Sequence, residues 1–296
     1  SRRFYNTPSS LIKVASSVIS RGSYFKRHIV SGELTYNVQT SERSMHQFSP
    51  ISLQYNYMTS HTAVFDSILN ANPYLKVTMK DVFIPKMRYS YIFNSSSRYR
   101  HPIWWQTTFS EASNLLSLAY MAAGKKWDEK DKTLFKNPFA HFFKIETDWR
   151  KTWKLNAHSQ LVAHASAGAI WSYGNATEAP YSEQFYVGGA NSIRAFTARS
   201  IGPGAYYPTA STNSYLDQTG DIKLLFNLEY RPLIGSLYGA VFIDAANVWA
   251  MHSSSMRPNA TFNVKNIAKE MALGTGIGLR YDLDFFVIRV DWGIGI

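Results

Sequence analysis

Long segments in which apolar and polar residues alternate constrain the fold of this chain more than any other feature. In 221–231 the apolar residues stand at every second position, at Ile222, Leu224, Phe226, Leu228 and Tyr230. The same period recurs in 269–282 and 284–296. A period of two residues is typical of a β-strand with one apolar and one polar face. The chain is therefore expected to be all-β.

The pattern predicts about eleven strands, many of them too long for a soluble sheet. They are expected near 9–21, 24–39, 47–58, 80–95, 102–112, 138–151, 154–172, 219–232, 236–250, 269–282 and 284–296. Soluble strands usually run about 5–6 residues, which disfavours the alternative of a soluble β-sandwich. Strands that cross an outer membrane need roughly 9–11 residues, with one face to lipid and the other to a wet lumen.

The connections between these segments alternate between long and short, as in an up-and-down barrel of the outer membrane. The long ones are 59–79, 113–137, 173–218 and 251–268, and we expect them to be extracellular. The short links fall at 21–23, 40–46, 96–101, Trp153, 233–235 and 282–284. Helical spacing of apolar residues predicts a short helix in 62–72.

Composition fits a barrel with a polar interior. Aromatic residues make up 15% of the chain, and the formal net charge is +11. Residues 1–150 contain 20 Lys and Arg against 10 Asp and Glu, a balance that a nucleic-acid-binding domain would also show. The cations lie mostly in loops or at every second strand position, so a charged lumen is favoured and no nucleic acid is expected. The absence of cysteine excludes disulfides and thiolate metal sites, and the 8 histidines lack metal-ligand spacing.

One segment adds a family resemblance to this pattern. Residues 185–204 read FYVGGANSIRAFTARSIGPG, with a glycine pair at Gly188 and Gly189, then Ile193-Arg194-Ala195-Phe196, then Arg199 and a Gly-Pro-Gly. The later stretches 219–231, 239–249 and 274–296 follow in the same order. Over roughly 110 residues the chain resembles the BamA/TamA family (bacterial surface antigen), outer-membrane barrels that assemble other outer-membrane proteins. Its many aromatic residues and long loops are similar to those of members from Bacteroidetes.

The resemblance implies that the long sixth loop, 172–218, folds back into the lumen. There Arg194 would pair with Glu229 and Asp244, and a guanidinium can bridge two carboxylates. The period independently places Glu229 on the polar face. A row of small residues, Gly274, Gly276 and Gly278, would leave room for the loop backbone. The alternative for Arg194 is a solvated loop arginine.

One position departs from the family. Ala195 stands where the family has glycine, so the loop tip is expected to be strained if that position needs a positive φ.

Counting strands back from this loop implies the fifth to the fifteenth strand of a barrel of about sixteen. Residues 1–296 would then be a partial transmembrane β-barrel without the first four strands, the closing strand or any periplasmic POTRA module.

The function implied by the resemblance is assembly or insertion of proteins in the outer membrane of a Gram-negative bacterium. The expected partners are membrane lipids and lipopolysaccharide, unfolded outer-membrane protein substrates, and periplasmic or lipoprotein accessory subunits. The alternatives are a two-partner-secretion-type translocation pore and the barrel anchor of a larger surface protein.

Enzymatic activity, a cofactor and a metal are not expected. The chain lacks the G-x-S-x-G elbow of a patatin-type hydrolase. Ser166, His158 and His164 share one face by the period alone, and no Gly-Lys-Ser/Thr follows the glycine pairs to make a phosphate cradle.

Overall fold

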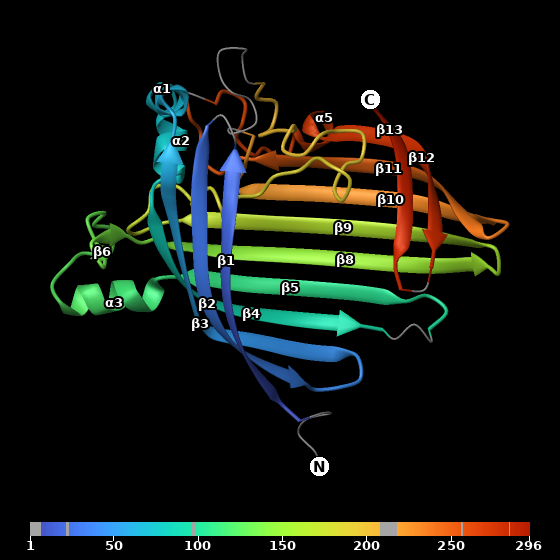
Figure 1. Ribbon diagram of the computed structural model, residues 1–296, viewed down its shortest axis with the longest axis horizontal. Helices are drawn as coiled ribbons and strands as arrows, with labels where there is room; N and C mark the ends of the chain where they lie inside the picture. Colours follow the sequence, from blue (N-terminus) through green and yellow to red (C-terminus); the bar gives the residue numbers. More distant parts are fainter. Residues whose placement is uncertain (1–6, 22–23, 96–98, 208–217, 256, 284) are drawn as a thin grey trace. The chain divides into compact units, whose positions relative to one another are not determined.

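The computed structural model describes residues 7–21, 24–95, 99–207, 218–255, 257–283 and 285–296 (Figure 1). Eleven strands form one antiparallel sheet in which each strand is hydrogen-bonded to its neighbours in the chain order β1-β2-β3-β4-β5-β8-β9-β10-β11-β12-β13. The first six are β1 (Ser9–Arg21), β2 (Phe25–Gln39), β3 (Ser44–His61), β4 (Val82–Asn94), β5 (Ile103–Ala112) and β8 (Phe142–Asn156). The others are β9 (Ser159–Ser172), β10 (Ile222–Ile234), β11 (Leu237–Trp249), β12 (Ala272–Asp282) and β13 (Val287–Gly295). The sequence period thus predicted the number and order of the strands.

Short elements fill the connections. They are α1 (Ala63–Ala71), α2 (Pro73–Thr78), α3 (Asn114–Ala122), the hairpin strands β6 (Thr133–Leu134) and β7 (Asn137–Pro138), and α5 (Ile267–Glu270). The helix predicted in 62–72 is α1, which begins where the Thr62 side chain accepts a hydrogen bond from Phe65 N. In Figure 1, α1 and α2 lie at the ends of β2 and β3, where the ring centres of Phe25 and Phe65 are 4.8 Å apart.

Two of the predicted turns need correction, and three other predicted short links lie partly outside the described residues. The link at Trp153 is wrong, because Trp153 lies inside β8 and the turn follows Asn156, whose side chain accepts a hydrogen bond from His158 N at 2.8 Å. The turn near 233–235 is shifted, since β10 continues to Ile234 and Gly235 follows it with a φ of 65°. Residues 22–23, 96–98 and 284, which belong to three predicted short links, are outside the described residues.

The chain divides into two compact units, which are described separately. Unit 1 comprises 1–92, 107–145 and 170–184, and unit 2 comprises 93–106, 146–169 and 185–296.

In unit 2 one face of the sheet is apolar and open, while the other is polar and covered. Phe226 and Leu228 expose 50% and 45% of their surface, whereas their neighbours Asn227 and Glu229 turn to the other face, where Glu229 is buried. The 185–207 segment packs on that polar face. The alternation seen in the sequence is therefore the alternation of two real faces.

Unit 1 repeats this division. Ile51 and Leu53 of β3 are half exposed, while Ser52 and Asn56 are buried. On the buried side, Asn56 Nδ2 donates to Ser182 Oγ at 2.7 Å, and Arg27 Nη2 donates to the Lys80 carbonyl at 2.9 Å. Basic side chains of β2 and β4 thus lie on the covered face, where the sequence predicted a charged interior.

Candidate functional site

The loop after β9 presents Arg194 from a closed tip. Gly189 N donates to the Phe196 carbonyl at 2.8 Å, and Phe196 N donates to the Ile193 carbonyl at 3.2 Å. Gly188 has a φ of 109°, and a Cβ there would lie 2.1 Å from the Thr197 carbonyl oxygen. Only glycine fits this position without a clash.

The strain expected at Ala195 is not present. Ala195 is not among the described residues with positive φ, whereas Arg199 adopts a φ of 61° and its guanidinium lies 3.6 Å from the ring centre of Tyr186. The alanine therefore fits the tip because the left-handed conformation occurs at Gly188, Gly189 and Arg199 instead.

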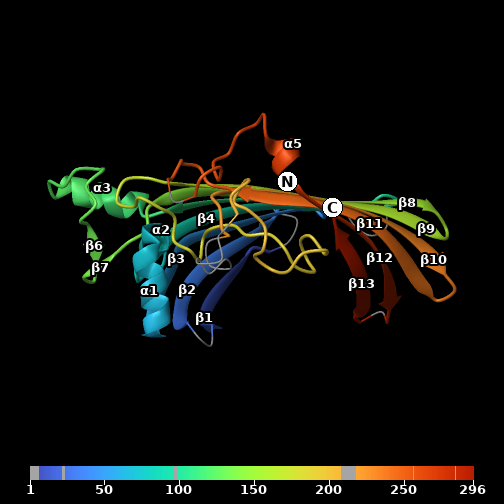
Figure 2. The same ribbon diagram turned by 90° about the horizontal axis from the view of Figure 1, so that it is seen from above.

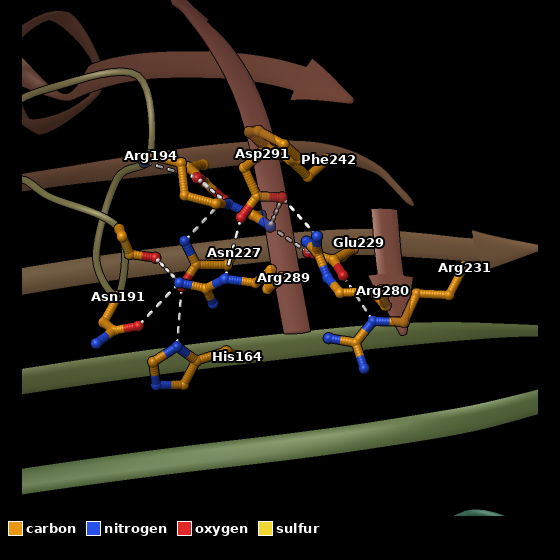
Figure 3. A network of polar contacts seen from close by, with 12 residues as sticks. His164, Asn191, Arg194, Asn227, Glu229, Arg231, Phe242, Arg280, Arg289 and Asp291 are labelled. Carbon is orange, nitrogen blue, oxygen red and sulfur yellow. Dashed lines mark hydrogen bonds and ion pairs between the residues drawn. The ribbon is translucent and has the colours of Figure 1, made fainter. Parts of the chain in front are cut away.

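Arg194 is bound on two sides by acids from neighbouring strands (Figure 3). Its Nε donates to Asp244 Oδ2 at 2.8 Å and its Nη2 donates to Asp244 Oδ1 at 2.7 Å, a bidentate pair with β11. Its Nη1 donates to Glu229 of β10, and its backbone N donates to Asp244 Oδ2 at 3.0 Å. The side chains of Arg194, Glu229 and Asp244 expose only 7%, 6% and 0% of their surface.

Arg194 keeps its positive charge although it is buried. Removal from water alone would lower the pKa of Arg194, but the hydrogen bonds to Asp244 and Glu229 outweigh it and leave the pKa above its ordinary value. The guanidinium also lies over the ring of Phe242, 3.5 Å from its centre. A planar cation with both carboxylates in its plane and a ring on one face has a fixed orientation.

Hydrogen bonds extend this contact toward β8. Asn227 Nδ2 donates to Asp244 Oδ1 at 2.8 Å and to the Ser192 carbonyl at 2.7 Å, so its Oδ1 is left as an acceptor. His164 Nδ1 lies 2.8 Å from that Oδ1, and its Nε2 lies 2.8 Å from Asp148 Oδ2. Both ring nitrogens of His164 therefore face acceptors.

Ion pairs extend the Arg194 contact toward β13. Arg280 Nη2 donates to Glu229 Oε2 at 3.0 Å, and Arg280 Nη1 lies 2.6 Å from Asp291 Oδ1. Arg289 Nε lies 3.1 Å from Asp291 Oδ2, and Arg289 Nη2 donates to the Ala190 carbonyl at 2.6 Å. The loop arginine thus stands at the centre of a continuous polar network that joins β8 to β13 through every strand between them (Figure 3).

The glycine row predicted to accommodate the loop does so at one position only. A Cβ on Gly274 would lie 2.9 Å from Ala195 Cβ. The prediction is wrong for Gly276 and Gly278, whose Cβ atoms would meet the Trp292 carbonyl and Asp291 Oδ1 at 2.1 and 2.2 Å. The loop instead lies on two glycines of β13, since a Cβ on Gly293 would lie 3.1 Å from Ala195 N and one on Gly295 2.8 Å from the Phe196 ring.

A second polar contact, in unit 1, was missed by the sequence. Glu183, in the same connection between β9 and β10, accepts from Lys86 Nζ of β4 at 2.6 Å and lies 3.6 Å from Lys144 Nζ of β8. Burial alone would raise the pKa of Glu183, but the two lysines hold it below its ordinary value. No motif marks these three residues, although Lys86 and Lys144 both stand on the polar register of their strands.

Neither contact has the geometry of a catalytic site. The ring nitrogens of His164 contact Asn227 and Asp148 and not Ser166, so a serine–histidine pair is not formed. Among the described ranges, no group of three or more His, Asp or Glu side chains could hold a metal ion. No helix in the described part of the chain is long and apolar enough to cross a membrane.

A sheet of long strands with one open apolar face, and a charged face covered by its own loop, defines a β-barrel of the outer-membrane class. The model of the Omp85 superfamily domain matches residues 133–296, and the chain belongs to this superfamily. It is thus an outer-membrane protein of Gram-negative type. The predicted fold class, an antiparallel up-and-down transmembrane β-barrel of which eleven strands are present, is confirmed.

One solved structure supports the fold, and two others are similar to a lesser degree. The structure of BamA from Haemophilus ducreyi lacking POTRA domains 1-3 matches with a TM-score of 0.65 and 15% identity, over 98% of this chain and 55% of that one. CdiB from Escherichia coli (TM-score 0.48, 12% identity) covers 98% of this chain and 45% of its own. CdiB from Acinetobacter baumannii matches with a TM-score of 0.47 and 11% identity, over 95% of this chain and 42% of that one. The chain spans about half the length of the structures that it matches.

Proposed function

We propose that the protein to which this chain belongs inserts or folds other proteins in the outer membrane. Membership of the Omp85 superfamily supports this proposal, as does the likeness in fold to BamA. The observation that carries it is the fastening of the 185–204 segment to the polar face by Arg194, because this loop would brace the barrel from inside. Insertion needs no bond chemistry, so we propose no enzymatic activity and no cofactor.

In the proposed mechanism the polar network holds the 185–204 segment in place, and that segment keeps the strands of the sheet in register. Glu229 and Asp244 belong to adjacent strands that pair directly, Asn227 opposite Asp244. A guanidinium that binds both carboxylates resists sliding of β10 against β11. A client strand could then add to an exposed strand edge elsewhere in the complete barrel while this part of the wall keeps its register.

The proposed surroundings follow from this role. The apolar face would contact membrane lipids and lipopolysaccharide, the loop 172–218 would enter from the extracellular side, and the clients would be unfolded outer-membrane proteins. Periplasmic or lipoprotein subunits would deliver them.

The test uses the full-length protein in phospholipid vesicles, with a urea-unfolded outer-membrane β-barrel protein as client. We expect the protein to speed client folding, followed as the heat-modifiable band, and R194A to lose most of that acceleration. The matched control is R88A, which removes an arginine paired with Glu33 on the same kind of face but 44% exposed. Equal acceleration by R194A and the native protein would overturn the role given to the loop.

The same vesicles test the alternative. Protection of a secreted soluble protein inside the vesicles, without any acceleration of barrel folding, would identify a translocation pore instead.

A further inference from the structure

The connection between β5 and β8 carries an apolar surface that the described residues of unit 1 leave exposed. Helix α3 exposes Leu115, Leu118 and Met121 by 63%, 53% and 44%. Their spacing of three places them along one side of the helix. Among the nine residues of α3, only Ser117 is buried. In Figure 1 and Figure 2, α3 and the β6–β7 hairpin extend past the ends of the adjacent strands.

The tip of the β6–β7 hairpin exposes a phenylalanine in an unfavourable backbone conformation. Phe135 and Lys136 are the two turn residues between Thr133–Leu134 and Asn137–Pro138, and both have positive φ, 49° and 66°. Turns of this kind favour Asn-Gly or Asp-Gly, and a bulky side chain with positive φ is an outlier. Phe135 is nevertheless 78% exposed, so burial within the chain does not compensate for the strain. Such an outlier points to a use for this side chain outside the chain.

Phe135 continues a row of aromatic side chains on the apolar face. Its ring centre lies 5.8 Å from that of Phe83 in β4. Phe83 stacks on Tyr55 of β3 at 4.3 Å, and Tyr55 stacks on Tyr57 at 5.2 Å. In an outer-membrane barrel this face contacts lipid, and aromatic side chains collect where acyl chains meet headgroups. The hairpin tip therefore extends the lipid-facing surface beyond the strands.

Hydrogen bonds join the second half of this connection to the segment that follows β9. Asn175 Nδ2 donates to the carbonyls of Lys132 and Phe139 at 2.9 and 3.1 Å. Lys130 Nζ donates to the carbonyls of Gly174 and Ala176 at 3.1 and 2.9 Å. A preformed apolar surface binds with little further loss of conformational entropy.

We propose that α3 and the Phe135–Lys136 tip form a second, membrane-interface contact of the barrel, in which this apolar surface enters the boundary of the outer leaflet. Leu115, Leu118 and Phe135 would contact acyl chains. Lys126 and Lys136 of the same connection suit the anionic phosphate groups above them, whereas Lys125 is paired with Glu129 and Asp131 at 3.0 and 2.6 Å. The occupant is lipid and not a protein, because the surface is continuous with the aromatic row that already faces lipid.

The test measures depth in the membrane at single positions. The 296 residues contain no cysteine, so one introduced cysteine is unique within this chain. Nitroxide labels on F135C and L118C are compared in vesicles of phosphatidylethanolamine and phosphatidylglycerol. The references are F109C, on the apolar face of β5, and V264C, whose residue is 73% exposed in a unit 2 loop.

We expect the labels at 135 and 118 to collide with oxygen several-fold more than with a water-soluble nickel chelate, as at 109. Collisions like those at 264 would overturn the proposal. Shielding from both reagents, with dipolar broadening between labels, would also overturn it in favour of a second protein copy.

A second variant separates anchoring from turn strain. Asn tolerates a positive φ better than Phe does, so F135N relieves the strain of the turn. If Phe135 had no contact with lipid, F135N would raise the unfolding temperature in vesicles as well as in detergent. The proposal predicts a gain in detergent that is lost or reversed in vesicles.

Discussion

The connection between β9 and β10 is fastened to the sheet twice, by opposite charge arrangements. In unit 2 a single cation, Arg194, lies between two acids. In unit 1 a single acid, Glu183, lies between two lysines. All six side chains are at least largely buried, yet the arginine contact is bidentate with donors at 2.7 and 2.8 Å, while one lysine stays 3.6 Å away.

The difference lies in the chemistry of the cations. A guanidinium has a rigid fork of donors that matches carboxylates in one geometry, whereas an ammonium is a point charge that tolerates displacement. The Arg194 contact therefore fixes the register of loop and strands, and the Glu183 contact supplies attraction with less directional control.

The largest effect is expected from R194A. It leaves Glu229 and Asp244 buried with one fewer cation, and breaking a buried pair in this way costs about 3–5 kcal/mol of unfolding free energy. R194K should recover only part of the loss, because an ammonium cannot bind both carboxylates in plane. Urea unfolding of the full-length protein in detergent, followed by gel mobility, measures this. Removal of the exposed Arg88 should cost no more than about 1 kcal/mol. An R194K variant as stable as the native protein would remove the distinction between the two contacts.

A smaller effect is expected from E183Q. The amide keeps a hydrogen-bond acceptor for Lys86 but removes the charge between two lysines, at a cost of about 2 kcal/mol. The matched variant K144M should cost less than K86M, since Lys144 lies 3.6 Å from Glu183 and Lys86 only 2.6 Å. The same unfolding assay measures this. If E183Q lowered the unfolding free energy as much as R194A does, the directional geometry of the guanidinium would not be what distinguishes the two contacts.

The smallest effect is a dependence on pH confined to unit 1. Burial, with the charges of Lys132 and Lys130, lowers the pKa of His141 from 6.5 to about 4. Its Nδ1 accepts from Asn175 N at 3.2 Å and its Nε2 lies 2.8 Å from Asn114 Oδ1, so the neutral ring fits its place. The unfolded chain thus binds a proton that the folded chain does not. The stability from this group is complete above about pH 6.5 and falls as the pH drops toward 4.

Hydrogen exchange in 113–137 at pH 7.5 and pH 5 measures this loosening, and H141Q should flatten the difference. Exchange in 185–204 should change less over this range, because the hydrogen-bond partners of His141, Asn175 and Asn114, belong to unit 1 and that segment belongs to unit 2. Equal acceleration in both segments would contradict a local effect.

The sequence predicted one of the two contacts because its signals are local. Alternation alone placed Glu229 on the polar face, and the resemblance over 185–204 paired Arg194 with Glu229 and Asp244. Glu183 has no motif, and its partners Lys86 and Lys144 come from strands far from it in the chain. Period gives the face of a residue but not its neighbour across the sheet.

The same limit explains the errors. Gly276 and Gly278 stand on the predicted face, but Phe242 and the Arg280–Asp291 pair reach them before the loop does. The false turn at Trp153 arose because Lys151 interrupts the apolar row of Trp149, Trp153 and Leu155. The strand continues past this interruption, and the turn forms only after Asn156.

The most direct test of the central claim, that Arg194 holds the loop against the wall, is a disulfide between loop and strand. An ideal Cβ at Gly274 lies 2.9 Å from Ala195 Cβ, close enough for a bond after a shift of about 1 Å. In A195C/G274C expressed under oxidising conditions, we expect most molecules to cross-link, and A195C/G276C to stay reduced because Phe242 occupies that side. Adding R194A should sharply reduce the A195C/G274C bond. Absence of the bond, or an equal yield without Arg194, would contradict the account.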